Sequence, residues 1–250
     1  MAGANKWPKA VFTDSKNTLW EWDPVWIRSC AGILEKYGSD MDPEQFWRVW
    51  IRWGVGENHR AAFAKYESFT ETLELGLEKA FQITGIPGTR DDVKFMTDLW
   101  GDVPPYPDTA PGLAKVQSMG VPVLIYSNVE TEYLDMMVDK LEGFRPAFVG
   151  DMEKSHSRKP SPRAYRWVLD TAGRELGIKL DYPDILYVAG PQWDVQGAMA
   201  LGMKGVWVRR NLDIAIDCHV GTEPQGVEPD YTVDDMYGVA EIVERCLAES

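Results

Sequence analysis

Short runs of apolar residues alternate along the chain with longer segments in which apolar positions recur every three or four residues. The short runs are typical of buried β-strands, and the longer periodic segments are typical of amphipathic helices. Their alternation predicts an α/β fold with a Rossmann-like, doubly wound parallel sheet. The predicted strands span residues 10–13, 121–126, 185–189 and 205–208, with a weaker strand at 146–149, and the predicted helices between them span 132–141, 162–176 and 195–201.

The segment between residues 21 and 107 shows helical patterning and little strand signal. Asp23 and Asp42 are each followed by proline, a pair typical of an N-cap and the first helical residue. We therefore predict a helical cap domain, residues 21–107, inserted into a core domain formed by residues 1–20 and 108–250. The predicted cap helices span 23–37, 42–53, 69–83 and 91–100, and the proline-rich stretch 103–108 is the predicted hinge.

Six of the eleven tryptophans lie between Trp20 and Trp53. Trp47, Trp50 and Ile51 are spaced so that they share one face of a helix. This spacing predicts a cap helix that packs its apolar face, and the alternative is the wall of an apolar pocket. The two interpretations are compatible, because a cap must cover whatever lies above the core.

The charge balance limits the partners that we expect. The 26 basic and 39 acidic side chains give a formal net charge of −13, which would repel a phosphate backbone and disfavours nucleic acid. No apolar run approaches the ~20 residues that span a bilayer, and the first ten residues hold no apolar segment of signal-peptide type. We therefore expect a cytoplasmic protein with no membrane partner.

The cysteines and histidines have no spacing that suggests a disulfide framework or a metal site. We accordingly expect neither a metal nor another cofactor. These residues are Cys30, Cys218 and Cys246, and His59, His156 and His219.

Polar residues follow the predicted strands. Asp14 ends the first strand and Ser127 and Asn128 end the second, whereas Lys159 precedes a helix and Asp194 follows a later strand. In a doubly wound sheet the ligand site lies at the carboxyl ends of the strands. We therefore expect these side chains to lie together.

These residue types suit covalent hydrolysis. A carboxylate such as Asp14 attacks carbon by displacement, and water then hydrolyses the resulting ester. Lys159 would keep Asp14 ionised, and Asp194 would orient Lys159 and help to activate water. The alternative for Lys159 and Asp194 is an ordinary salt bridge beside a helix start. Backbone N–H groups after Asp14 and at residues 127–128 would hold a carboxylate or phosphate of the substrate.

Four segments of the chain resemble, in order, the four motifs of the haloacid dehalogenase superfamily. The segment 158–165 has a K-P-x-x-R-x-Y pattern, and the W-D-x-x-G-A pattern that begins at Trp193 resembles the type II 2-haloacid dehalogenases. Those enzymes also carry a W-R pair in a cap helix, which Trp47 and Arg48 resemble. The four segments span residues 11–19, 124–128, 158–165 and 188–198.

The resemblance implies roles for ten residues, and it suggests a homodimer. Asp14 would be the nucleophile, Thr18 its hydrogen-bonding support, and Arg48 the partner of a departing halide, although Arg48 also fits a solvated helix face because Arg52 lies one turn on. The full catalytic set is Asp14, Thr18, Arg48, Lys159 and Asp194, and the expected substrate-binding set is Ser15, Lys16, Ser127, Asn128 and Tyr165.

The chain departs from the family pattern at four positions. Phosphatases of the superfamily carry acidic residues where this chain has Lys16 and Gly190, so a magnesium site is disfavoured. Type II dehalogenases usually have Tyr at position 16, and Ser and Asn where this chain has Ala189 and Pro191. The leading hypothesis is a metal-independent hydrolase of a small, anionic 2-substituted carboxylic acid, with (S)-2-haloacids first. The alternatives are azetidine-2-carboxylate hydrolysis, a phosphatase, and a non-catalytic binding protein.

Overall fold

The computed structural model describes residues 6–63, 66–210 and 228–250. Within them a six-stranded, wholly parallel sheet has the order β3-β2-β1-β4-β5-β6. Cys218 and His219 lie outside the described residues. The strands are β1 (Ala10–Thr13), β2 (Val123–Ser127), β3 (Phe148–Asp151), β4 (Ile185–Ala189), β5 (Lys204–Val208) and β6 (Tyr231–Val233).

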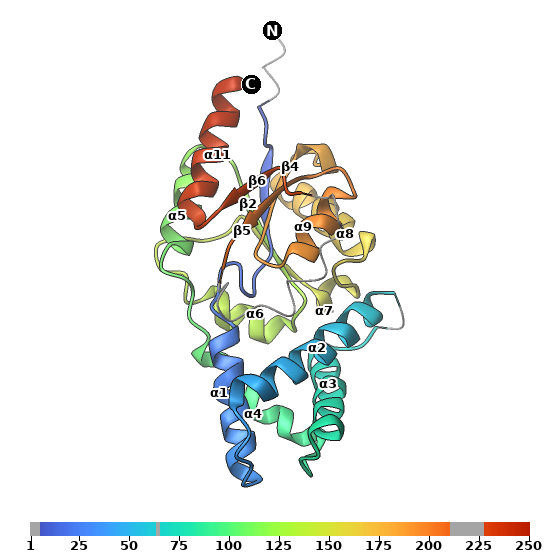
Figure 1. Cartoon of the computed structure of the whole chain (residues 1–250). Coiled ribbons are helices and arrows are strands. Elements are labelled where there is room, and N and C mark those ends of the chain that lie inside the picture. The colour runs from blue at the N-terminus through green and yellow to red at the C-terminus, as the bar shows by residue number, and fades with distance from the viewer. Residues whose placement is uncertain (1–5, 64–65, 211–227) are drawn as a thin grey trace.

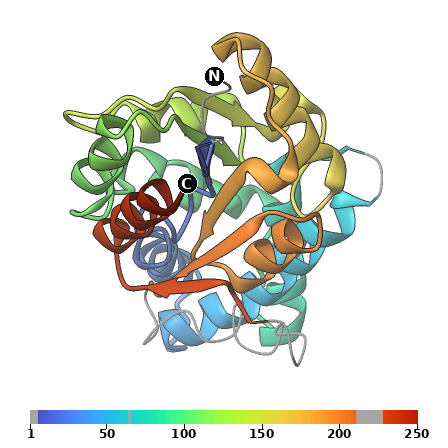
Figure 2. The same cartoon turned by 90° about the horizontal axis from the view of Figure 1, so that it is seen from above.

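The sheet is buried on both faces, as expected for parallel strands. Along β1 successive side chains point to opposite sides, so Val11 joins one apolar cluster and Phe12 joins the other. Helices α5 (Thr109–Ser118) and α11 (Met236–Glu249) cover one face, and α8 (Pro162–Leu176) and α9 (Gln192–Met199) cover the other (Figure 2). The predicted doubly wound α/β fold is confirmed.

Strand order reverses beside β1. This strand pairs with β2 on one side and with β4 on the other, and Thr13 lies level with Ile125 and Val188. The carboxyl ends of these three strands therefore meet at one edge of the sheet. Helix α6 (Thr131–Val138), the short α7 (Met152–Ser155) and the cap lie at this edge (Figure 1). This is the position at which doubly wound sheets bind ligands.

The cap is built from helices, as predicted. Asp42 caps the start of α2 by accepting hydrogen bonds from the amides of Glu44 and Gln45, and Ser68 forms a capping box with Glu71 at the start of α3. The domain boundaries at residues 20/21 and 107/108 stay a proposal. The cap elements are α1 (Asp23–Lys36), α2 (Pro43–Ala62), α3 (Phe69–Thr84), the 3-10 turns η1 (Arg90–Val93) and η2 (Trp100–Asp102), and α4 (Lys94–Thr97).

Helix α2 is longer than predicted. It continues to Ala62 through two glycines that favour an earlier end. One of them, Gly54, lies where α2 crosses α3, and a Cβ on Gly76 of α3 would lie 2.5 Å from the backbone nitrogen of Gly54. Close packing of the two helices therefore outweighs the low helix propensity of glycine.

The predicted helix at 91–100 is wrong. The segment divides into η1, α4 and η2, because buried Asp92 accepts hydrogen bonds from the Thr89 amide and the Tyr37 hydroxyl and holds the start in a 3-10 turn.

Helices α5 and α11 and strand β6 were not predicted. Pro111 and Gly112 obscure the pattern of α5, but Gly112 is needed there, because a Cβ on it would lie 2.7 Å from the backbone of Met236 in α11.

Candidate active site

Asp14 lies directly after β1 with a buried carboxylate. Its backbone amide donates to the carbonyl of Val188 at 2.9 Å, so the residue is still tied to the sheet. Its Oδ1 accepts a 2.6 Å hydrogen bond from the Lys159 ammonium, and its Oδ2 accepts one of 2.7 Å from the Thr18 hydroxyl. The Thr18 hydroxyl in turn accepts from the Gly190 amide at 2.8 Å. Both carboxylate oxygens are therefore fixed in direction.

Lys159 joins two carboxylates. Its ammonium lies 2.6 Å from Asp14 Oδ1 and 2.5 Å from Asp194 Oδ2, and it also donates to the Tyr187 hydroxyl at 3.1 Å. Burial acts to lower the pKa of Lys159, but the two carboxylates outweigh it and hold that pKa above its usual value. Asn128 fixes the backbone of Lys159 through two 2.8 Å hydrogen bonds: its side-chain oxygen accepts from the Lys159 amide, and its side-chain nitrogen donates to the Lys159 carbonyl.

Asp194 holds Lys159 in place through an ion pair. This fully buried side chain accepts hydrogen bonds from the Tyr165 hydroxyl at 2.6 Å and the Tyr187 hydroxyl at 2.7 Å, besides its contact with Lys159. Burial raises the pKa of Asp194, against the pull of the Lys159 charge. The sequence analysis missed Tyr187, although a tyrosine within a buried strand usually needs a partner for its hydroxyl.

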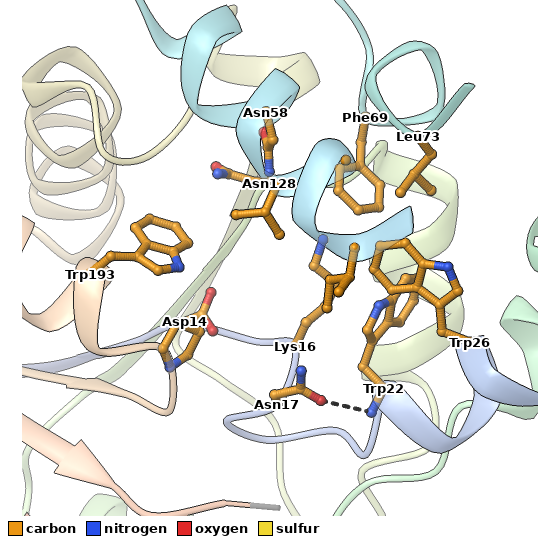
Figure 3. Close-up of a pocket in the computed structure, with 14 residues that line it drawn as sticks. Asp14, Lys16, Asn17, Trp22, Trp26, Asn58, Phe69, Leu73, Asn128 and Trp193 are labelled. Atoms are coloured by element: carbon orange, nitrogen blue, oxygen red, sulfur yellow. Dashed lines mark hydrogen bonds between the residues drawn. The ribbon is translucent and has the colours of Figure 1, made fainter. Parts of the chain in front are cut away.

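A cavity of about 70 Å³ separates the Asp14 carboxylate from the cap (Figure 3). Lys16 and Asn128 are the other predicted site residues that line it. Much of its wall is apolar and comes from the cap. Of the three residues predicted to share one helix face, Ile51 lines the cavity, whereas Trp47 and Trp50 are buried in the apolar cluster, as the packing interpretation expects. The described lining residues are Asp14, Lys16, Asn17, Trp22, Trp26, Ile51, Gly54, Val55, Asn58, Phe69, Leu73, Asn128, Pro191 and Trp193.

Lys16 points its ammonium at aromatic rings of the cap. The nitrogen lies 3.3 Å from the ring centre of Phe69 and 5.1 Å from that of Trp22, within the range of cation–π attraction. Burial lowers the pKa of Lys16 to about 7, although the Asp14 charge opposes this shift. The side chain therefore exchanges a proton near neutral pH while it faces the cavity.

The turn after Asp14 restricts position 190. Asn17 has a left-handed backbone with φ of 54°. A Cβ on Gly190 would lie only 2.0 Å from the Asn17 carbonyl oxygen. A carboxylate side chain at position 190 is therefore incompatible with this turn.

The other predicted residues lie apart from the cavity. Ser15 and Ser127 are buried and hydrogen-bonded to each other at 2.5 Å, and neither lines the cavity. Arg48 donates to Glu44 of its own helix at 2.5 Å and is also absent from the lining. A role for Arg48 with halide stays a prediction. Asn17, Asn58 and Trp193 line the cavity but were not among the predicted site residues. Asn17 and Trp193 lie within the motif segments, although no role was assigned to them, whereas Asn58 lies on a cap helix outside every motif.

The described residues contain no cluster of three or more His, Cys, Asp and Glu side chains arranged as metal ligands. Among the same residues no helix is both long enough and apolar enough to cross a bilayer.

Comparison with known proteins gives relatives at low identity, whereas no family model matches the chain. An (S)-2-haloacid dehalogenase of Pseudomonas fluorescens is 25% identical over 209 residues, covering 80% of this chain and 84% of that protein. A phosphoglycolate phosphatase of Neisseria gonorrhoeae is 26% identical over 202 residues, covering 80% and 79%. The structure of the L-2-haloacid dehalogenase from Xanthobacter autotrophicus with covalently bound chloropropionic acid matches with a TM-score of 0.74 at 20% identity, covering 94% and 98% of the two chains. The sequence relatives support a hydrolase.

Proposed function

We propose that this chain, which has the fold of the L-2-haloacid dehalogenases and resembles the type II enzymes of their superfamily, hydrolyses a small 2-substituted carboxylic acid. We place (S)-2-haloacids first among the substrates. The observation that carries the proposal is the position of Asp14. Among the described residues that line the cavity it is the only carboxylate, and Lys159 and Thr18 fix its two oxygens.

The reaction has two steps. An oxygen of the Asp14 carboxylate forms a bond to carbon 2 of the substrate, and the bond to the leaving atom breaks with its electron pair on that atom. Water then attacks the carbonyl carbon of the Asp14 ester, which releases a 2-hydroxy acid and restores the carboxylate. Lys159 keeps Asp14 ionised for the first step. Asp194 is engaged by three donors and does not line the cavity, which supports a role in holding Lys159.

The size and charge of the cavity suit a small organic anion. A volume of about 70 Å³ has room for about five water molecules, judged by the space that one water needs. The Lys16 ammonium supplies positive charge at the wall, and the backbone amide of Lys16, which lines the cavity, donates to no acceptor among the described residues. These groups would hold the substrate carboxylate.

The donor set does not fit a magnesium ion. Magnesium needs several oxygen ligands, but both oxygens of Asp14 are bound by donors, and the Lys159 and Lys16 ammonium groups would repel a second cation. Position 190 cannot hold an acidic side chain, because a Cβ there would clash with the Asn17 carbonyl oxygen. We therefore propose metal-independent hydrolysis and rank a phosphatase below it.

Lys16 favours a second candidate, hydrolysis of a strained ring such as azetidine-2-carboxylate. A ring nitrogen leaves carbon more readily when it receives a proton, and a pKa of about 7 lets Lys16 donate one near neutral pH. In this reaction the C–N bond breaks, Asp14 forms the same ester, and the proton of Lys16 passes to the nitrogen.

A single-turnover experiment in heavy-oxygen water tests the proposed covalent step. Excess protein with a 2-haloacid should incorporate one heavy oxygen into the peptide that contains Asp14, and Asp14→Asn should lose turnover by far more than a hundredfold. The matched control is Asp98→Asn, which changes an exposed carboxylate of the cap. Heavy oxygen found only in the product would refute the ester. The homodimer stays a proposal from the resemblance alone, which sedimentation would test, and the cytoplasmic location stays a proposal from the sequence composition.

A further inference from the structure

Arg158 is a buried cation at the junction of core and cap. It directly precedes Lys159 in sequence, and only 2% of it is exposed. Its guanidinium donates to the Asn58 side-chain oxygen on α2 and to the backbone carbonyl of Glu67, both in the cap. Both acceptors are neutral, and Arg158 makes no ion pair within the described parts of the chain.

Burial of a charge without a counter-ion costs stability, so the fold places Arg158 here at an energetic cost, and a functional role would offset that cost. Its one side-chain acceptor is Asn58, which lines the cavity. A guanidinium only donates hydrogen bonds, so it must hold the oxygen end of the Asn58 amide. The NH₂ end therefore turns away from Arg158, and it has no acceptor among the described residues.

Asn58 faces the nucleophile across the cavity. Figure 3 shows Asn58 on the cap side of the cavity and Asp14 on its core side, and both residues line it. Displacement at carbon requires the leaving atom to depart on the side opposite to the nucleophile, so the group that receives it must lie on the cap side. Arg48, the residue expected there from the family pattern, is bonded to Glu44 and does not line the cavity.

We infer that Asn58 is a catalytic residue that donates an N–H hydrogen bond to the leaving atom, and that Arg158 is the positioning residue that fixes the direction of this amide. The inference rests on the proposed function. The positive charge of Arg158 polarises the amide through the oxygen that it binds and so strengthens the N–H donor. Negative charge that develops on the leaving atom as its bond breaks is stabilised by this donor.

The decisive variant is Asn58→Asp. Aspartate keeps an oxygen acceptor for Arg158 but offers no N–H donor, so the contact between core and cap survives while the proposed catalytic group is removed. We expect kcat to fall by roughly tenfold to a hundredfold, as for a lost hydrogen bond to a developing charge, with a melting temperature that does not fall, because the new carboxylate gives the buried Arg158 charge a counter-ion. Arg158→Lys should lower kcat less than Asn58→Asp, and Arg28→Met, which removes an exposed arginine of the cap, should change nothing.

Leaving-group dependence separates this role from a structural one. Chloride leaves carbon less readily than bromide, so loss of the donor should slow 2-chloropropionate more than 2-bromopropionate. The bromo to chloro ratio of kcat should therefore rise in Asn58→Asp and Asn58→Leu and stay at the wild-type value in Arg28→Met. An unchanged ratio in both Asn58 variants would overturn the inference.

Bromide binding distinguishes failure of this inference from failure of the proposed function. Calorimetric titration of the wild-type protein with sodium bromide should show binding that Asn58→Leu and Asn58→Asp lose. If the wild type hydrolyses neither haloacid but shows this pattern, the proposed function fails and the anion contact of Asn58 stands. A wild type that binds no bromide, or an Asn58→Leu variant that binds it equally well, would contradict the role of Asn58.

Discussion

Lys159→Met removes the cation that joins two buried carboxylates. Asp14 and Asp194 lie 2.6 and 2.5 Å from the Lys159 ammonium, and all three side chains are almost wholly buried. The variant leaves two carboxylates near one another with no cation between them. Their repulsion and their lost hydrogen bonds destabilise the folded protein, while the unfolded chain is hardly affected.

The expected loss is large for a single substitution. Removing one partner of a buried ion pair costs about 3–5 kcal/mol. For a chain of this length each kcal/mol lowers the melting temperature by roughly 2–4 °C, so we expect a decrease of about 6–20 °C. The matched control is Lys94→Met, which removes an exposed lysine paired with Asp98 on the cap surface. That change should cost about 0.3–0.5 kcal/mol, or less than about 2 °C.

The effect should depend on pH. Burial raises the pKa of Asp194 in the folded protein, and loss of the Lys159 charge raises it further. A carboxyl group whose folded pKa exceeds its unfolded value stabilises the fold when protonated, and that stabilisation is lost as the pH rises through the folded pKa. The difference in melting temperature between wild type and Lys159→Met should therefore be smaller at pH 5 than at pH 8.

Thermal unfolding followed by circular dichroism from pH 5 to pH 8 measures both effects. The double variant Lys159→Met with Asp194→Asn removes the uncompensated charge and should recover part of the loss. Equal melting temperatures of Lys159→Met and Lys94→Met would refute the reasoning, because the two carboxylates would then not depend on this cation. A loss that does not change with pH would show that lost packing of the side chain dominates.

Two further predictions concern Lys16 and metal ions. Because burial lowers the pKa of Lys16 to about 7, the ammonium is lost as the pH rises through that value, so wild-type kcat/KM for an anionic acid should fall between pH 6 and pH 9. Lys16→Met should lower kcat/KM about tenfold to a hundredfold at pH 6 and lack the alkaline fall, and a wild-type profile that is flat over this range would contradict a substrate contact. Exhaustive EDTA treatment should leave the rate unchanged and added magnesium should alter it by less than about twofold, whereas strong activation by magnesium would favour a phosphatase.

The sequence predicts elements best where one local pattern determines them. Helix α8 has the predicted bounds because Ser161, Pro162 and Gly177 define its ends, and β1 and β4 are short apolar runs with polar residues at their ends. The predictions failed where contacts between distant segments determine the secondary structure. From the local sequence alone Gly54 favours a helix end, but its contact with Gly76 of α3 keeps it within α2. Pro111 likewise weakens the helical pattern of α5, which is stabilised by packing against α11.

The residues of the candidate site also divide into those that local motifs predict and those that depend on contacts between distant segments. The motifs identify Asp14, Lys159 and Asp194, which the structure brings within hydrogen-bonding distance, and their assigned roles stay proposals. Tyr187 gives only the weak signal of a tyrosine in a buried strand, and the local sequence gives no signal for Asn58. Asn58 depends on Arg158, 100 residues further along the chain, and that contact exists only because the cap packs against the core.

The position of β1 at the centre of the sheet has a consequence for how the protein is made. This strand leaves the ribosome before both of its neighbours, and its partners lie at residues 123–125 and 185–188. The cap elements, from Asp23 to Asp102, are contiguous in sequence and pack largely on one another, so they can form on the nascent chain while β1 has no partner. Until β2 is made the apolar run 10–13 has no strand partner, and until β4 is made it keeps one open edge, which favours non-native strand pairing. Asp14 and Lys159 therefore meet only after well over half of the chain has been made, and a chain that stops before residue 159 has no catalytic centre.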